Sequence, residues 1–157
     1  MQRLSYPIDA QIEITERCNQ RCIHCYNYWR YSQETKKDEM NISDFMLVLE
    51  KLHDCGISVI TLTGGEPFLR PEILFSLIDQ AKRYNMEVGL NSNAIFITKN
   101  YADRLADNGL DHALISLLGT ETTHNSIVNM PTGFKDTCNG INNLINSGIK
   151  TAVNMVV

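Results

Sequence analysis

The chain contains 157 residues, of which 43% are hydrophobic, and it carries a formal net charge of −4. This length and composition predict one globular domain with a single core. The negative charge argues against a nucleic-acid partner, which usually needs a basic face, and no run approaches the roughly 20 apolar residues of a membrane-spanning helix. The first residues also lack an apolar signal sequence, so we expect a cytoplasmic protein without a membrane partner.

Short β-like runs alternate with longer helical runs along the chain, which is typical of parallel βα units. The predicted strands cover residues 10–15, 58–63, 87–91, 112–117 and 150–157. The predicted helices run from the N-cap Ser43 to a stop at Gly56, from Pro71 to Ala81, from Thr98 to Leu105, and from Phe134 to Asn146.

Two segments lack this periodicity. The polar stretch 32–39 is predicted to be a mobile part of the surface. A longer connection containing His124 and Pro131 is predicted before the fourth helix, and we expect His124 to lie on the surface there.

The fold class that follows is α/β, because right-handed crossovers between consecutive parallel strands build one sheet with helices outside. Segments rich in cysteine, glycine and polar residues follow the strands at their carboxyl ends, the edge where such folds bind ligands. The last predicted strand is apolar and is followed by no helix that would cover it. We therefore expect a fragment of a longer barrel, and the alternative is that this edge of the sheet pairs with something else.

Three of the five cysteines fall in the loop after the first strand, with the spacing C-x3-C-x2-C: Cys18, Cys22 and Cys25. Thiolates this close together can reach three corners of one cubane cluster without long-range help from the fold. Because four-iron clusters usually have four thiolates, one iron would stay open to another ligand. The remaining two, Cys55 and Cys138, lie in helical runs and are expected to be buried packing residues.

Three alternatives to an iron–sulfur cluster remain for the cysteine loop. A structural zinc site prefers four protein ligands, and His24 is a poor fourth because its neighbour Cys25 is already used. A thioredoxin-like pair of Cys22 and Cys25 would leave Cys18 idle. Unrelated structural cysteines are the third alternative, and the spacing favours iron–sulfur over all three.

A second motif, after the second predicted strand, accompanies the cysteine loop. The cysteine loop reads C-x3-C-x-aromatic-C with His24 at the aromatic position, and Gly64-Gly65-Glu66-Pro67 follows the second strand. Both motifs resemble those of the radical SAM (S-adenosylmethionine) superfamily, and the resemblance runs from residue 12 to residue 157. The resemblance implies that residues 1–157 form a radical SAM core domain, a partial (β/α) barrel that is incomplete at its C-terminus because it is truncated before the sixth unit.

The resemblance implies a [4Fe–4S] cluster on the three cysteines and SAM beside it. The glycines would let backbone approach the methionine amino group closely, and Glu66 would accept hydrogen bonds from that ammonium. His24 would lie beside the adenine. The implied SAM-binding residues are His24, Gly64, Gly65, Glu66, Pro67, Asn93, Ser116 and Asn154.

The implied activity is reductive cleavage of SAM to a 5′-deoxyadenosyl radical, which abstracts hydrogen from a peptide or small-molecule substrate. The run from Ser116 to Gly119 resembles the subgroup of peptide maturases and molybdenum-cofactor synthesis enzymes. An electron donor such as flavodoxin or ferredoxin is also implied. The alternatives are a catalytically incomplete module that binds cluster and SAM, and a zinc-binding structural domain.

Overall fold

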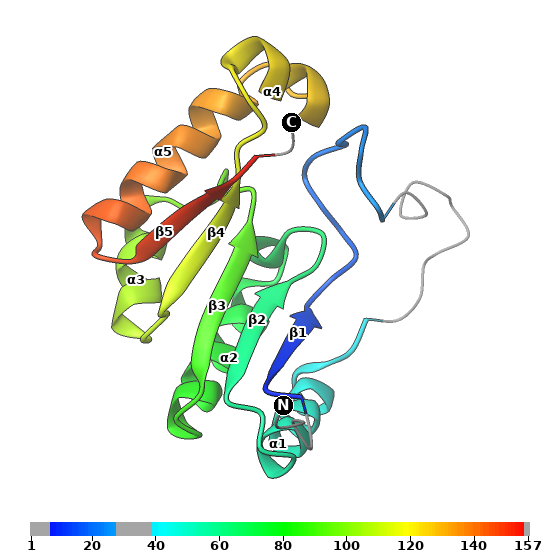
Figure 1. The fold of residues 1–157 in the computed structure, drawn as a ribbon, viewed down its shortest axis with the longest axis vertical. Coiled ribbons are helices and arrows are strands. Elements are labelled where there is room, and N and C mark those ends of the chain that lie inside the picture. Colours follow the sequence, from blue (N-terminus) through cyan, green and yellow to red (C-terminus); the bar gives the residue numbers. More distant parts are fainter. Residues whose placement is uncertain (1–6, 28–38, 156–157) are drawn as a thin grey trace, which may run out of the picture.

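The computed structural model describes residues 7–27 and 39–155. Of the polar stretch 32–39 predicted to be mobile, only Glu39 belongs to the described residues. One parallel sheet runs through the molecule in the order β1-β2-β3-β4-β5, so every strand pairs with its neighbour in the sequence (Figure 1). The strands are β1 (Asp9–Glu13), β2 (Val59–Thr63), β3 (Glu87–Ser92), β4 (His112–Ser116) and β5 (Lys150–Asn154). The predicted α/β fold with about five parallel strands is confirmed.

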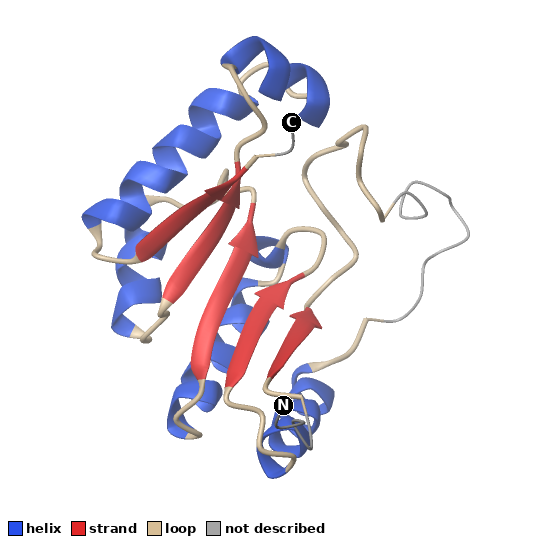
Figure 2. Cartoon of the chain, viewed as in Figure 1, coloured by secondary structure: helices blue, strands red, loops and turns tan. Residues whose placement is uncertain are grey.

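The helices connect the strands and gather on one face of the sheet, except for α4, which lies above the carboxyl ends of β4 and β5 (Figure 1, Figure 2). They are α1 (Ile42–Asp54), the 3₁₀ helix η3 (Pro67–Leu69), α2 (Pro71–Arg83), α3 (Lys99–Asp107), α4 (Glu121–Val128) and α5 (Gly133–Asn146). In the described part of the chain no helix has the length and apolar content to cross a bilayer.

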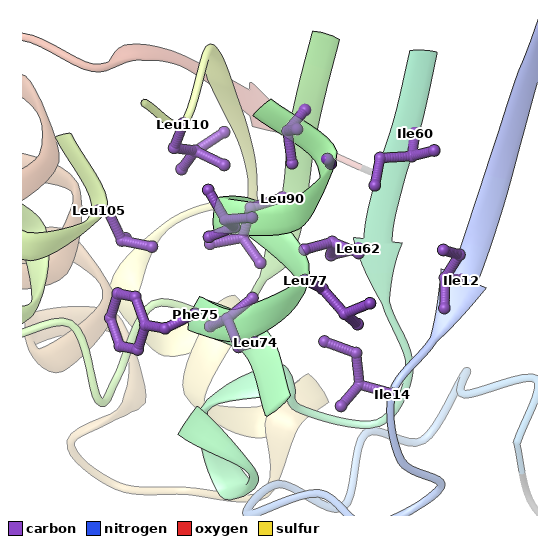
Figure 3. Packing of buried hydrophobic residues seen from close by; sticks show 14 of the residues in the cluster. Ile12, Ile14, Ile60, Leu62, Leu74, Phe75, Leu77, Leu90, Leu105 and Leu110 are labelled. Carbon is purple, nitrogen blue, oxygen red and sulfur yellow. The ribbon is translucent and has the colours of Figure 1, made fainter. Parts of the chain in front are cut away.

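The core lies between the sheet and these helices. Ile60 and Leu62 of β2 face Leu74 and Leu77 of α2, and all four side chains are fully buried (Figure 3). Alternate residues of the strands point to the other face, where Thr61 and other polar side chains stay half-buried. The helix-covered face of the sheet therefore holds the apolar core, and the opposite face carries polar side chains.

Several helix ends follow the predicted signals. Pro71 occupies the first turn of α2, and Thr98 caps α3 by accepting the N–H of Tyr101. The predicted cap of α1 is wrong by two residues. Asn41 caps it instead of Ser43, and Asp44 closes a capping box by accepting the N–H of Asn41.

The connection predicted around His124 is also wrong, because residues 121–128 form helix α4. His124 lies inside it and is fully buried, with Nδ1 accepting the N–H of Leu118 at 3.0 Å. Cys55 and Cys138 were both predicted to be buried. The prediction is wrong for Cys55, which caps the end of α1 and is exposed, and Cys138 is partly buried in α5. Helix α4 escaped prediction because its sequence is mostly polar and shows only a weak apolar stripe.

Candidate functional site

A pocket of about 240 Å³ opens at the carboxyl edge of the sheet, between the cysteine loop and the strand ends. This volume is below the roughly 300–1,000 Å³ of sites that enclose a drug-sized ligand, so the described residues would cover only part of such a ligand. The lining contains no lysine or arginine among the described residues and is rich in thiols, amides and hydroxyls. The predicted site residues that line it are Cys18, Cys22, His24, Cys25, Gly64, Gly65, Asn93, Ser116 and Asn154.

The two glycines hold the cysteine loop against the end of β2. The N–H of Gly65 donates to the carbonyl of Thr15 at 2.6 Å, and the N–H of Glu66 donates to the carbonyl of Arg17 at 2.8 Å. A Cβ on Gly65 would lie 2.0 Å from the carbonyl oxygen of Arg17, and one on Gly64 would lie 2.4 Å from that of Thr15. The glycines are thus required by the protein's own backbone, whereas the sequence had suggested only the approach of a ligand.

The far side of the cysteine loop is fastened to α4. The N–H of Arg21 donates to the carbonyl of Val128 at 3.3 Å, and the N–H of Ile23 donates to that of Ile127 at 2.9 Å. Arg21 and Ile23 flank Cys22, so these bonds fix the backbone on both sides of a thiol. The spacing of the cysteines gave no indication that a distant helix also holds the loop. A threonine and a glutamate at residues 120 and 121 were the only sequence signal of this helix start.

Glu66 is turned into the protein and is fully buried. One carboxylate oxygen accepts the N–H of Phe68 at 3.1 Å, the other accepts the N–H of Asn93 at 3.0 Å, and the hydroxyl of Ser92 bonds to both. Burial raises the pKa of Glu66, and these N–H and O–H donors oppose that rise. Glu66 and the buried Pro67 do not line the pocket, so the structure separates them from the other predicted site residues.

Three predicted residues from different strands meet at the pocket. Ser116 and Asn154 are register partners at the ends of β4 and β5, and Asn93 directly follows β3. Parallel strands bring their carboxyl ends to one edge, which is why residues so distant in sequence converge there. His24 also lines the pocket but is itself exposed, so it lies at the rim.

The spacing of the cysteine sulfurs distinguishes a site for a single zinc ion from a site for a cubane cluster. Among residues 7–27 and 39–155, no three histidine, cysteine or acidic side chains are close enough to hold a single metal ion. A structural zinc ion needs four ligands around one atom. A cubane cluster takes each thiolate on a different iron, so its ligands must surround one space rather than meet at one point. Three cysteines around one pocket fit the larger group.

Glu39 contacts the residues at which the cysteine loop begins. Its carboxylate accepts hydrogen bonds from the hydroxyl of Thr15 and from the guanidinium of Arg17, at 2.9 Å for Arg17 Nη2, and Arg70 lies 3.8 Å away. Burial would raise the pKa of Glu39, but these hydrogen bonds and the two positive charges outweigh it, so the pKa lies below its usual 4.5.

We expect Glu39 to make the fold sensitive to acid. A carboxyl whose pKa is lowered by folding adds stability above its unfolded value of 4.5, and this is lost as pH falls through the lower folded value. In urea unfolding at several pH values, Glu39→Gln should lose less free energy of unfolding than the parent protein as the pH falls below 4.5. Glu50→Gln, on the exposed side of α1, serves as control. Parallel pH profiles for the parent and Glu39→Gln would contradict the expectation.

The model of the radical SAM superfamily matches residues 12–157, which include the cysteine loop and all the strand ends that line the pocket. The chain belongs to the radical SAM superfamily. Both sequence motifs that suggested the family lie in the matched region, and the cysteines of the first and the glycines of the second line the same pocket.

Curated radical SAM relatives resemble this chain over most of its length. GTP 3′,8-cyclase of Campylobacter curvus is 26% identical over 147 residues, which cover 93% of this chain and 45% of the relative. PqqA peptide cyclase of Bradyrhizobium diazoefficiens is 30% identical over 115 residues, which cover 73% of this chain and 30% of the relative. The chain spans less than half the length of either relative.

Solved structures share the radical SAM fold. SuiB of Streptococcus suis bound to S-adenosylmethionine superposes with a TM-score of 0.76 at 18% identity, covering 96% of this chain and 33% of that one. The structure of SuiB with its precursor peptide SuiA gives a TM-score of 0.79. At this identity the likeness establishes the fold, and the partial barrel predicted from sequence is confirmed by it.

Proposed function

We propose that this chain binds a [4Fe–4S] cluster through Cys18, Cys22 and Cys25, and binds SAM in the adjoining pocket as part of a radical SAM enzyme. The observation that carries the proposal is that three thiols and the backbone of Gly64 and Gly65 line one pocket. Together the cluster and SAM would supply one-electron cleavage of the sulfonium C–S bond and hydrogen abstraction from a substrate. The chain's own residues would bind, orient and enclose these groups.

The proposed roles follow from where each residue lies. Asn93, Ser116 and Asn154 present amide and hydroxyl groups to the pocket, which suits the polar parts of SAM. His24 at the rim suits a contact with the adenine. Glu66 would act indirectly, because its carboxylate fixes the backbone of Asn93 and of Phe68. Pro67 would help by starting η3 beside the glycine turn.

We favour a peptide as the substrate. PqqA peptide cyclase is among the relatives, and SuiB, which shares the fold, has been solved with the precursor peptide SuiA. A small molecule remains the second candidate, because GTP 3′,8-cyclase is a relative of similar strength. We further propose a cytoplasmic location and an electron donor such as flavodoxin or ferredoxin.

The test is anaerobic reconstitution of the protein with iron and sulfide, followed by metal analysis and visible spectroscopy. We expect four irons and four sulfides per chain, as in a [4Fe–4S] cluster. Cys22→Ala should lose the cluster, and Cys55→Ala, at the exposed end of α1, should retain it. A single zinc ion and no iron would overturn the proposal in favour of a zinc-binding domain.

Activity is tested separately on the reconstituted protein. Incubation with SAM and dithionite should release 5′-deoxyadenosine and methionine. An intact cluster that binds SAM but yields no 5′-deoxyadenosine would favour the alternative of a catalytically incomplete module.

A further inference from the structure

The side chain of Asn93 points its amide nitrogen at a proposed cluster ligand. Nδ2 lies 2.7 Å from Asn19 Oδ1 and 3.8 Å from Cys18 Sγ, both within hydrogen-bond range for their atom types. The backbone N–H of Gln20 approaches the same sulfur at 3.4 Å. Two N–H donors thus converge on one thiol of the three.

The orientation of this amide is set by its surroundings. Asn93 Oδ1 accepts the N–H of Ile95 at 3.1 Å, and a backbone N–H can only donate, so the atom facing Cys18 is the NH₂ group. The residue has 7% exposure. Its own N–H donates to Glu66 at 3.0 Å and its carbonyl accepts from Thr137 at 2.9 Å. Asn93 is therefore held rigidly with a donor toward sulfur.

We propose that Asn93 is a positioning residue that raises the reduction potential of the cluster through an N–H···S hydrogen bond to Cys18. This inference rests on the proposed function. When the cluster takes up one electron from its donor, negative charge increases on the thiolate sulfurs. A fixed N–H donor stabilises that added charge more than it stabilises the oxidised cluster, and hydrogen bonds to the sulfurs are known to set such potentials.

The test is a redox titration of the reconstituted protein in the absence of SAM, in which electron paramagnetic resonance measures the fraction of reduced cluster. Asn93→Ala should shift the midpoint to more negative potential. At a fixed potential the ratio of reduced to oxidised cluster should fall by up to about fivefold, the full effect of one hydrogen bond of ordinary strength, because only the difference between the two redox states counts. Asn91→Ala is the matched control, because Asn91 is the same residue type and lines the same pocket two residues earlier.

A second variant covers the case in which Asn93→Ala fails to hold the cluster. Asn93→Asp keeps the oxygen that accepts from Ile95, removes the donor and adds a negative charge, so it should lower the potential further than Asn93→Ala does. The wild-type cluster should further show one more coupled exchangeable proton than either variant, because the N–H of Gln20 stays near Cys18 in all three proteins. An unchanged potential in a variant with an intact cluster, or an equal shift in Asn91→Ala, would overturn the inference alone. Absence of iron from the wild-type protein would instead overturn the proposed function.

Discussion

Replacing Gly65 by alanine is expected to lower the free energy of unfolding by about 3 kcal/mol and to prevent cluster loading. The new Cβ would lie 2.0 Å from the carbonyl oxygen of Arg17 and 2.5 Å from its carbon. Both are backbone atoms, so no side chain can rotate away to make room. The cysteine loop must separate from the end of β2, and the hydrogen bonds from Gly65 to Thr15 and from Glu66 to Arg17 are lost with it.

Urea unfolding and iron analysis after anaerobic reconstitution measure the two effects. Gly148→Ala is the control: a Cβ there meets nothing within 4 Å, although the backbone has a φ of +80° that disfavours alanine. That strain should destabilise by about 1–2 kcal/mol and leave iron content unchanged. If Gly65→Ala were as stable as Gly148→Ala and held a full cluster, the close packing of loop on strand would not be needed.

The second large effect is expected for Glu66→Gln, which should destabilise the fold by about 1–3 kcal/mol. The two carboxylate oxygens each accept a backbone N–H, one from Phe68 and one from Asn93. A glutamine keeps one oxygen and places an NH₂ group against the other N–H. A buried donor then faces a donor, and water cannot reach the site because Glu66 is fully buried.

The same substitution should weaken the pocket. The carboxylate joins the turn after β2 to the turn after β3, so its loss frees the backbone of Asn93. We expect weaker binding of SAM to the reconstituted protein, measured by equilibrium dialysis, together with the lower unfolding energy. Glu72→Gln, an exposed carboxylate on α2, should change the unfolding energy by less than about 0.5 kcal/mol. Wild-type stability with reduced SAM affinity would instead point to direct contact between Glu66 and the ligand.

Much of this architecture could be predicted from the sequence because it rests on local signals. Apolar runs of β-branched residues marked the strands, and Pro71 and Thr98 marked two helix starts. Because parallel strands end at a shared edge, the sequence also predicted where a ligand would bind. Ser116 and Asn154 were named only through the family resemblance, and the structure places both at the pocket on that edge.

The features that escaped prediction depend on contacts between distant segments. Nothing around Glu66 in the sequence indicates that its partners are Ser92 and Asn93. The polar sequence of α4 hides a helix that is stabilised by burial of Val128 and by packing against α5. Cys55 was predicted to be a buried packing residue because free cysteine behaves as a small hydrophobe, but its position at the end of α1 leaves it exposed.

The cysteine loop is bonded on one side to the turn after β2 and on the other to the last carbonyls of α4. Its shape is consequently a property of the assembled domain rather than of the short motif that contains the thiols. A peptide cut to that motif would carry the same three sulfurs but neither of the two backbone anchors that orient them. Ribosomal synthesis makes the cysteine motif well before residues 127 and 128, so the loop can reach its final shape only after helix α4 has been synthesised.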